Sequence, residues 1–254
     1  MANANGDEVN GSMRIVVVSR PRSGNHWIEC LLGTIYDLDG LGGARKPDAT
    51  KPKAFRQWAE GGGFPDGSMF HLHCRYKPEF YDAIEAVPAH VVTIVRDPYD
   101  AFVSRYYWTQ QRRPKDCEKA ERRPRQRMVG KPLDDPEVLA FLADANGFGS
   151  HLSTANGWLH SGRAVVVRYE ELHRDPIEEL TRVTDAIAPV SQDQIEAAIE
   201  ACSAENMRLR SERKAWNIRV AKVGDSRERL GEAHLAIFRE RYADLIRSLG
   251  YDVR

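Results

Sequence analysis

The sequence predicts an α/β fold in which a parallel β-sheet is flanked by helices and a P-loop-like strand, turn and helix binds phosphate. Three observations predict it. Four short apolar runs are each followed by turn or cap residues, stretches with helical spacing lie between them, and the apolar residues within each run are continuous rather than alternating. Continuous apolar runs suit strands that are buried on both faces. Alternating strands and helices favour a parallel sheet with right-handed crossovers, whose ligands lie beyond the carboxyl ends of the strands.

The predicted strands lie at residues 15–18, 69–73, 91–95 and 165–167. A helix is expected directly after the first strand, because its apolar residues fall at i, i+1, i+4, i+5 and i+8 and so share one face. These residues are Trp27, Ile28, Leu31, Leu32 and Ile35.

The last third of the chain reads as helical, with helices expected at residues 177–187 and 192–202 and in a long closing segment. The closing segment carries an apolar stripe at helical spacing, which is typical of a face packed on a core. The stripe consists of Leu235, Phe238, Tyr242, Leu245, Ile246 and Leu249.

The length of 254 residues suits one large domain. Residues 1–12 are polar and are expected to form a disordered tail, with a single domain at 13–254. The 37 basic and 37 acidic residues cancel, so net charge implies no nucleic acid or anionic membrane as partner. The polar start and the lack of any stretch of about eighteen apolar residues predict a cytoplasmic protein. A homodimer is left open.

The four cysteines are Cys30, Cys74, Cys117 and Cys202. They are far apart in the sequence and form no CxxC pair, which argues against a zinc site and against a disulfide framework. We therefore expect four reduced thiols.

Residues 112–127 contain eight basic residues, three acidic residues and two prolines. This composition is typical of a solvated or disordered loop. The alternative is a mobile lid or a patch for an acidic acceptor, and the sequence does not decide whether 112–132 form an ordered lid.

The first strand is followed by SRPRSGNHW, residues 19–27. A strand, a glycine-containing turn and a helix start together make a phosphate cradle, because unpaired backbone N–H groups and the helix dipole point to one spot. Arg22 can reach the same phosphate. The GxxxxGK[ST] pattern of P-loop kinases is absent.

The third strand is followed by RDPYDAFVSRY, residues 96–106. Arg96 stands at the carboxyl end of the strand, and Pro98 suits the start of a helix. Ser104 lies about two helical turns further on. Arg96 and Ser104 could therefore meet at one phosphate.

These segments resemble the PAPS-dependent sulfotransferase family, where PAPS is 3'-phosphoadenosine-5'-phosphosulfate. SRPRSGNHW is similar to the family's TYPKSGTTW, and RDPYDAFVSRY is similar to RNPKDxxVSxY. Two weaker matches are VRYEELHRDP at 167–176 and RVAKVGD at 219–225, the latter similar to RKGxxGDW. The resemblance runs from about residue 14 to 251 and implies the soluble, cytosolic-type fold.

The resemblance implies transfer of the sulfuryl group from PAPS to a hydroxyl or amine of a small-molecule acceptor by in-line displacement, with 3'-phosphoadenosine-5'-phosphate (PAP) as product and no metal required. The phosphosulfate would bind at the loop, the adenine near Trp27 and Tyr169, and the 3'-phosphate at Arg96, Ser104 and Arg219. The implied cofactor-binding residues are Arg22, Ser23, Gly24, Asn25, His26, Trp27, Arg96, Ser104, Tyr169 and Arg219.

The resemblance also implies the catalytic groups. Arg22 stands where cytosolic members carry a lysine, and a permanently charged guanidinium would stabilise the leaving phosphate electrostatically. The base should be a histidine at the end of the second strand. His71 and His73 both qualify because alternation puts them on one face, and the family's KTH histidine falls closest to His73.

Four departures from the family pattern bear on the site. Asn25 and His26 replace hydroxyl residues, Ala221 replaces a glycine of the late loop, and Ser226 replaces its tryptophan. The alternatives to an active enzyme are a catalytically inactive PAPS- or PAP-binding protein, a P-loop-like nucleotide kinase, and an interaction protein. Acceptor identity depends on loops such as 40–67 and 112–132.

Overall fold

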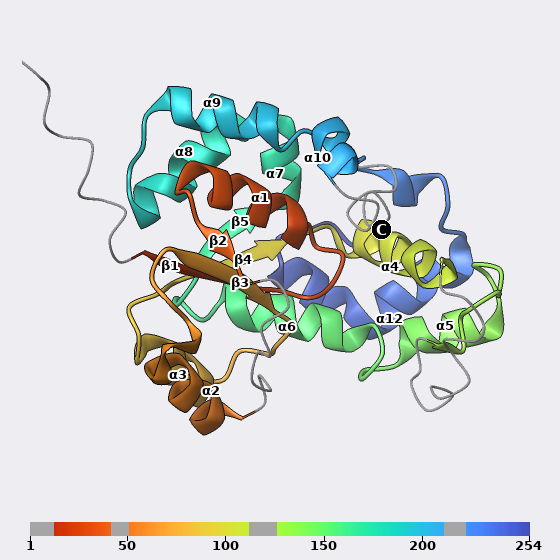
Figure 1. The fold of residues 1–254 in the computed structure, drawn as a ribbon. Coiled ribbons are helices and arrows are strands. Elements are labelled where there is room, and N and C mark those ends of the chain that lie inside the picture. Colours follow the sequence, from red (N-terminus) through yellow and green to blue (C-terminus); the bar gives the residue numbers. More distant parts are fainter. Residues whose placement is uncertain (1–12, 42–50, 112–125, 211–221) are drawn as a thin grey trace, which may run out of the picture.

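The computed structural model describes residues 13–41, 51–111, 126–210 and 222–254. Its centre is a five-stranded parallel sheet in the order β2-β3-β1-β4-β5 (Figure 1). The strands are β1 (Arg14–Val18), β2 (Asp39–Gly40), β3 (Ser68–Leu72), β4 (His90–Val95) and β5 (Val165–Arg168). This confirms the predicted fold class.

Helices cover both faces of the sheet (Figure 1). Ile15 and Val17 of β1 pack with α1 (Asn25–Ile35), α8 (Pro176–Ile187) and α9 (Gln192–Ala201). Val16 and Val18, which point the other way, pack with α2 (Pro52–Trp58), α3 (Pro78–Glu85) and Trp158 of α6 (Gly149–Leu159). Burial on both faces explains why the strand runs are continuously apolar.

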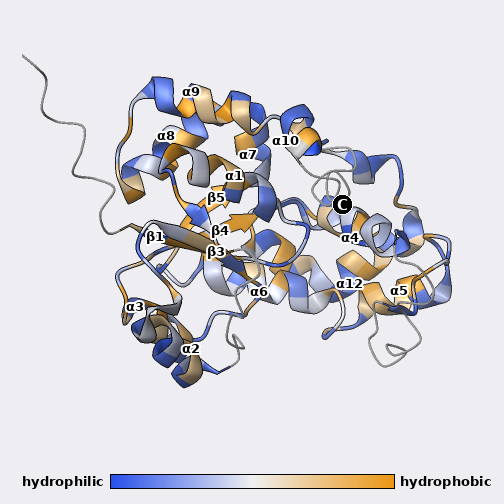
Figure 2. Cartoon of the chain, in the orientation of Figure 1, coloured by the Kyte–Doolittle hydropathy of each residue, from blue (hydrophilic) through white to orange (hydrophobic). Residues whose placement is uncertain are grey.

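A further apolar cluster joins the end of β4 to α4 (Pro98–Gln110), α5 (Pro136–Ala143), α6 and α12 (Glu232–Ser248). The remaining elements are η1 (Ala59–Gly63), α7 (Tyr169–Arg174), α10 (Ala204–Arg210) and η4 (Asp225–Arg227). In the predicted closing stripe, Phe238, Tyr242 and Ile246 are buried, so the stripe is core. Figure 2 shows the apolar colour concentrated on the strands and on helix faces turned inward.

Helix starts follow local chemistry. Asp97 accepts a hydrogen bond from the Asp100 backbone amide at 2.9 Å and precedes Pro98 at the start of α4. Asp175 and Pro176 start α8 in the same way, with Asp175 accepting from the Glu178 amide at 3.0 Å. An aspartate cap followed by proline is a strong start signal, because the cap binds a free amide and proline lacks one.

The expectation of four reduced thiols is wrong, because Cys30 and Cys202 form a disulfide. Their Cα atoms are 5.8 Å apart although 172 residues separate them in the sequence. Helices α1 and α9 pack side by side and bring the two cysteines together, which sequence spacing does not reveal. Cys74 is a buried free thiol whose pKa desolvation raises to about 12. Cys117 lies outside the described residues.

Among the residues that the structure describes, no helix is both long and apolar enough to cross a membrane. The expected tail at 1–12 and most of the basic segment at 112–127 lie outside those residues. The division into a tail and one domain stays a prediction.

Candidate active site

The loop between β1 and α1 has the backbone of a phosphate cradle. Gly24 directly precedes α1 with φ 112° and ψ 13°, and no side chain caps the helix start. The Trp27 amide donates to the Gly24 carbonyl at 3.0 Å, so the backbone amides of Asn25 and His26 are the groups of α1 suited to a ligand, and the helix dipole favours an anion there. A Cβ atom on Gly24 would stand 2.8 Å from both Ile94 Cδ1 and Tyr169 Cδ2, so only glycine fits.

Side chains behind the loop hold its shape. The Ser19 hydroxyl donates to the Asn25 side chain, and Asn25 Nδ2 donates to the Arg20 carbonyl at 3.4 Å. Ser23 is 2% exposed and its hydroxyl lies 3.4 Å from His151 Nε2. The side chains of Ser23 and Asn25 thus brace the loop, which leaves their backbone amides as the groups suited to bind a ligand.

Helix α6 supplies two supports that sequence reasoning missed. Ser150 accepts a hydrogen bond from Arg20 Nη2 at 3.1 Å, and His151 contacts Ser23. Burial, followed by the positive charges of Arg20 and Arg105, holds the pKa of His151 well below its ordinary value, so this imidazole is neutral. No local motif marks these residues, because they act through packing across more than a hundred residues.

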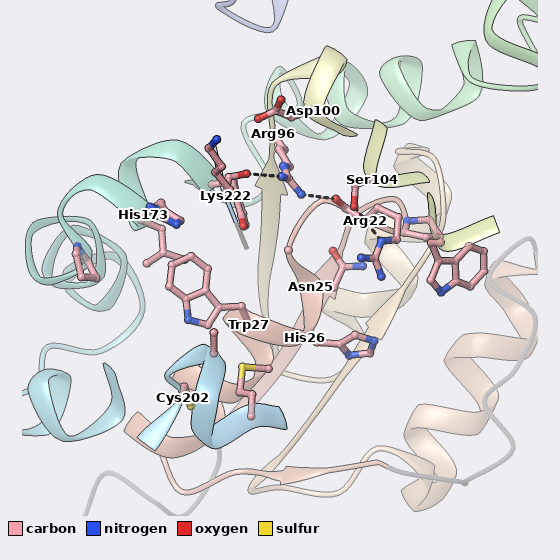
Figure 3. A pocket seen from close by; sticks show the side chains of 18 of the residues that line it. Arg22, Asn25, His26, Trp27, Arg96, Asp100, Ser104, His173, Cys202 and Lys222 are labelled. Atoms are coloured by element: carbon pink, nitrogen blue, oxygen red, sulfur yellow. Dashed lines mark hydrogen bonds between the residues drawn. The ribbon is translucent and has the colours of Figure 1, made fainter. Parts of the chain in front are cut away.

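Arg22, Arg96 and Ser104 lie together at one end of the cavity (Figure 3), where Arg22 stands between the two residues that the spacing was expected to bring to one phosphate. Arg22 Nε donates to the Ser104 hydroxyl at 3.2 Å, and Arg96 Nη1 donates to the Arg22 carbonyl at 3.4 Å. The Arg96 guanidinium also lies 4.1 Å from the centre of the Tyr169 ring, a cation–π contact. Two guanidinium groups beside a free helix start make this end of the site strongly attractive to anions.

Asp100 is a further residue that sequence reasoning missed. It is 2% exposed and accepts hydrogen bonds from the backbone amides of Gly224 at 2.6 Å and Ser226 at 2.9 Å. Asp100 thereby fixes the late loop against α4, and the backbone carbonyl of Lys222 in that loop accepts a hydrogen bond from Arg96 Nη2 at 3.2 Å. Since Ser226 is held through its backbone, the departure from the family's tryptophan leaves this anchor intact. Arg219 lies outside the described residues.

Aromatic and apolar side chains line the other side of the loop. The Trp27 ring lies 5.8 Å from that of Tyr169 and 6.1 Å from that of His173, both edge to face. Leu172, Pro176 and Met207 extend this wall. Such a wall suits a flat aromatic ring.

The two histidines of the second predicted strand lie on one face, as alternation predicts, with ring centres 4.9 Å apart. His73 Nδ1 lies 2.7 Å from the Ser19 carbonyl oxygen, which can only accept, so Nδ1 carries the proton and Nε2 is left to accept one. His73 is open to the cavity, but the surrounding protein atoms desolvate it. This desolvation is the main reason why the pKa of His73 is lowered to about 4. The charges of His71, Arg20 and Arg105 lower the pKa further, whereas the hydrogen bond to the Ser19 carbonyl raises it.

His71 has a different partner. Its Nδ1 lies 2.7 Å from Glu29 Oε1, and Glu29 Oε2 lies 3.3 Å from His26 Nδ1. Burial would raise the pKa of Glu29, but the hydrogen bonds and charges of the two histidines lower it to about 2. Glu29 is therefore a carboxylate at every ordinary pH.

The loop, the two arginines, Ser104, the aromatic wall and the two histidines of the second predicted strand border one cavity of about 540 Å³. Its lining includes every predicted site residue that the structure describes except Ser23, whose side chain is buried on the side of the loop that faces His151. Residues that also line it and were not predicted include Asp100, Leu172, His173 and Met207.

The fold and the site define an α/β protein whose strand, turn and helix start are suited to bind a phosphate group. The sequence profile described as "Sulfotransferase domain" matches residues 68–250, so the chain belongs to the sulfotransferase family. The family and the enzyme class predicted from the sequence, a PAPS-dependent sulfotransferase, are confirmed.

Solved structures show the same fold. One similar structure is mouse sulfotransferase SULT7A1 complexed with PAP, with a TM-score of 0.69, 18% identity, and coverage of 92% of this chain and 84% of that one. Another is retinol dehydratase in complex with androsterone and the inactive cofactor PAP, with a TM-score of 0.62, 16% identity, and coverage of 95% and 82%. None of the curated proteins compared matches the sequence significantly.

Proposed function

We propose that this sulfotransferase binds PAPS in the 540 Å³ cavity and transfers its sulfuryl group to a hydroxyl or amine of a small-molecule acceptor. The observation that carries the proposal is the convergence of the free start of α1, Arg22, Arg96 and Ser104 at one end of a cavity whose wall also holds His73. The PAP bound in the two similar structures supports the same ligand here.

The residues present fit the two ends of PAPS. Backbone amides at Ser23, Gly24, Asn25 and His26 would hold the 5'-phosphosulfate. Arg96 and Ser104 would hold the 3'-phosphate, and Arg219 is proposed to join them from the sequence resemblance alone. Arg96 Nε is buried and has no hydrogen-bond partner within the described part of the chain, so the side chain retains a donor for a ligand. Trp27 and Tyr169 would flank the adenine.

Arg22 and a histidine would carry the chemistry. His73 Nε2 accepts the acceptor proton while the acceptor oxygen forms its bond to sulfur. The bond from sulfur to the 5'-phosphate oxygen breaks in the same step, and Arg22 stabilises the charge that grows on that phosphate. PAP and the sulfated acceptor leave. His71 remains the alternative base.

The acceptor is proposed to be a small molecule. Retinol dehydratase carries androsterone in the similar structure above and retinol in a second complex, which supports this class and no particular compound. A cytoplasmic location, a homodimer and the absence of nucleic-acid and membrane partners stay predictions.

The experiment that tests the proposal is thermal unfolding with PAP, AMP or magnesium ATP at equal concentration. A ligand at a hundred times its Kd stabilises the native state by about 2.7 kcal/mol, which raises Tm by about 5–10 °C for a chain of this size. A rise with PAP alone is expected, and a rise with magnesium ATP alone would contradict the proposal. Mass spectrometry of acceptor mixtures incubated with PAPS then separates an enzyme, which yields sulfated products, from a binding protein, which yields none.

A further inference from the structure

A cluster of three side chains, two of which line the cavity, has no role in the proposed transfer as a set. His26 and Glu29 lie on one face of α1, three residues apart, and His71 comes from the penultimate position of β3. One nitrogen from each ring and one carboxylate oxygen lie within 4.8 Å of one another. His26 and His71 also line the cavity.

Each of the two histidine rings directs its Nδ1 atom toward the Glu29 carboxylate. His71 Nδ1 lies 2.7 Å from Glu29 Oε1, and His26 Nδ1 lies 3.3 Å from Glu29 Oε2. Around a tetrahedral zinc ion with bonds of about 2.0–2.2 Å, neighbouring ligand atoms stand about 3.3 Å apart. The separation from His26 equals that value, the separation from His71 is shorter, and the three ligand atoms all lie within 4.8 Å of one another, so the side chains need to shift by about an ångström to surround an ion.

Glu29 is prepared to bind a cation. Within the described residues, each of its two carboxylate oxygens lies at hydrogen-bond distance from one histidine nitrogen, so both rings already direct a nitrogen toward it. It lies beyond the first turn of α1, where the positive field of the helix start has weakened. His26 has 44% of its side chain exposed, which gives an ion an entry path.

We propose that His26, Glu29 and His71 form a binding site for a zinc ion at the part of the cavity wall that lies beside His73. Two imidazole nitrogens and one carboxylate are an established ligand set for zinc, and three protein ligands leave the fourth position open toward the cavity. The proposed transfer uses no metal. An ion there would lie beside His73, whose ring is 4.9 Å from that of His71, and would exclude the acceptor and inhibit the reaction.

Zinc binding is measured on the full chain by competition with a chromophoric chelator, without PAPS or acceptor, so the result does not depend on the proposed function. Wild type should bind one ion at least about tenfold more tightly than Glu29→Gln or His26→Ala, since each removes one of three ligands. His173 lines the cavity but lies away from His26 (Figure 3), so His173→Ala should bind like wild type. Equal affinity of wild type and Glu29→Gln would overturn the site.

Cobalt(II) serves as a spectroscopic substitute that identifies the ligands. Visible bands without a thiolate charge-transfer band in the near ultraviolet are expected, because no cysteine belongs to the cluster. A thiolate band would place the ion at a cysteine and overturn the assignment. Circular dichroism of each variant separates loss of the site from loss of the fold.

The inhibitory role rests on the proposed function and has its own test. Zinc at ten times its Kd should lower the transfer rate of wild type by about tenfold, and a chelator should restore it. An unchanged rate with zinc bound would overturn the inhibition and leave both the binding site and the transfer activity standing.

Discussion

Arg96 is held on three sides before any ligand arrives. It donates to the carbonyls of Arg22 and Lys222 and stacks on Tyr169. Because these contacts already fix the guanidinium, binding an anion costs little further side-chain order. A residue prepared in this way contributes its hydrogen bonds to binding with little entropic loss.

The variant Arg96→Ala should therefore bind PAP about ten- to a hundredfold more weakly, which corresponds to about 1.5–3 kcal/mol for hydrogen bonds to a charged group. Isothermal titration measures the change. Arg163→Ala is the matched control, since Arg163 is exposed and its cation–π partner is Tyr81, outside the cavity lining. Unchanged affinity in Arg96→Ala would remove this residue from the 3'-phosphate site.

The variant His73→Asn tests the proposed base. The asparagine amide can still donate to the Ser19 carbonyl, so the loop should keep its shape and the Kd for PAP should stay within about twofold. The rate of transfer should fall by about 10²–10⁴-fold, the usual contribution of a general base. His160→Asn, whose ring binds Ser248 away from the cavity, is the control. A larger fall in His71→Asn than in His73→Asn would make His71 the base.

Site residues that belong to one contiguous sequence motif could be predicted from the sequence. Residues that support the site through contacts with partners distant in the sequence could not. Arg22 and Gly24 follow β1 directly, and Arg96 follows β4, so strand ends and spacing suffice to place them. His151, Asp100 and Glu29 support the site through partners 42 to 128 residues away. Their roles depend on which helix faces pack together, which periodicity in a single helix does not specify.

At the scale of elements, β1, the loop and α1 depend on one close approach. Gly24 has φ 112°, and its missing Cβ leaves room for Ile94 of β4 and Tyr169 of α7. The same Tyr169 ring carries the Arg96 guanidinium. The glycine thus sets how near the loop, β4 and α7 come to one another.

We expect Gly24→Ala to lower stability by about 1–3 kcal/mol, because alanine is strained at this φ and its Cβ meets two side chains at 2.8 Å. PAP affinity should fall as well, since Tyr169 must move. Chemical denaturation and titration measure both effects. Gly157→Ala in α6, where the new Cβ would make an ordinary 3.4 Å contact with Tyr76, should leave stability unchanged or higher. Equal effects at the two glycines would contradict this account.

Strands were predictable where the local signal is strong. β1, β3, β4 and β5 are apolar runs, and all four were placed within two residues of their bounds. The edge strand β2 is only Asp39 and Gly40, both exposed, and it exists because Asp39 N and Leu41 N bond to carbonyls of Gly67 and Met69 at 2.8 and 2.9 Å. Neither residue favours a strand, so only the tertiary pairing creates it.

At the scale of the whole molecule, the Cys30–Cys202 disulfide ties the first helix after the loop to the end of α9, and Cys202 borders the cavity. It closes a loop across most of the chain, which restricts the unfolded state strongly. Disulfides persist in oxidising compartments and are rare in the cytosol, so the bond argues against the predicted cytoplasmic location.

Reduction with a dithiol, or the double variant Cys30→Ser/Cys202→Ser, should lower stability by about 2–5 kcal/mol. Denaturation with and without reductant measures this change. The double variant should no longer respond to the reductant, and that insensitivity is the control. Wild type whose unfolding midpoint is the same with and without reductant would show that the bond does not contribute to stability.

The sequence separation of the two cysteines also determines how long after Cys30 its partner is synthesised. A ribosome adding about 5–20 residues per second takes about 9–34 s to make the 172 residues between Cys30 and Cys202. For that interval the nascent chain carries Cys30 as a thiol, beside Cys74 and Cys117 as they emerge. The native bond is therefore a late event of biosynthesis, and the yield of correctly linked protein will depend on how well oxidation is delayed until the last third of the chain has been made.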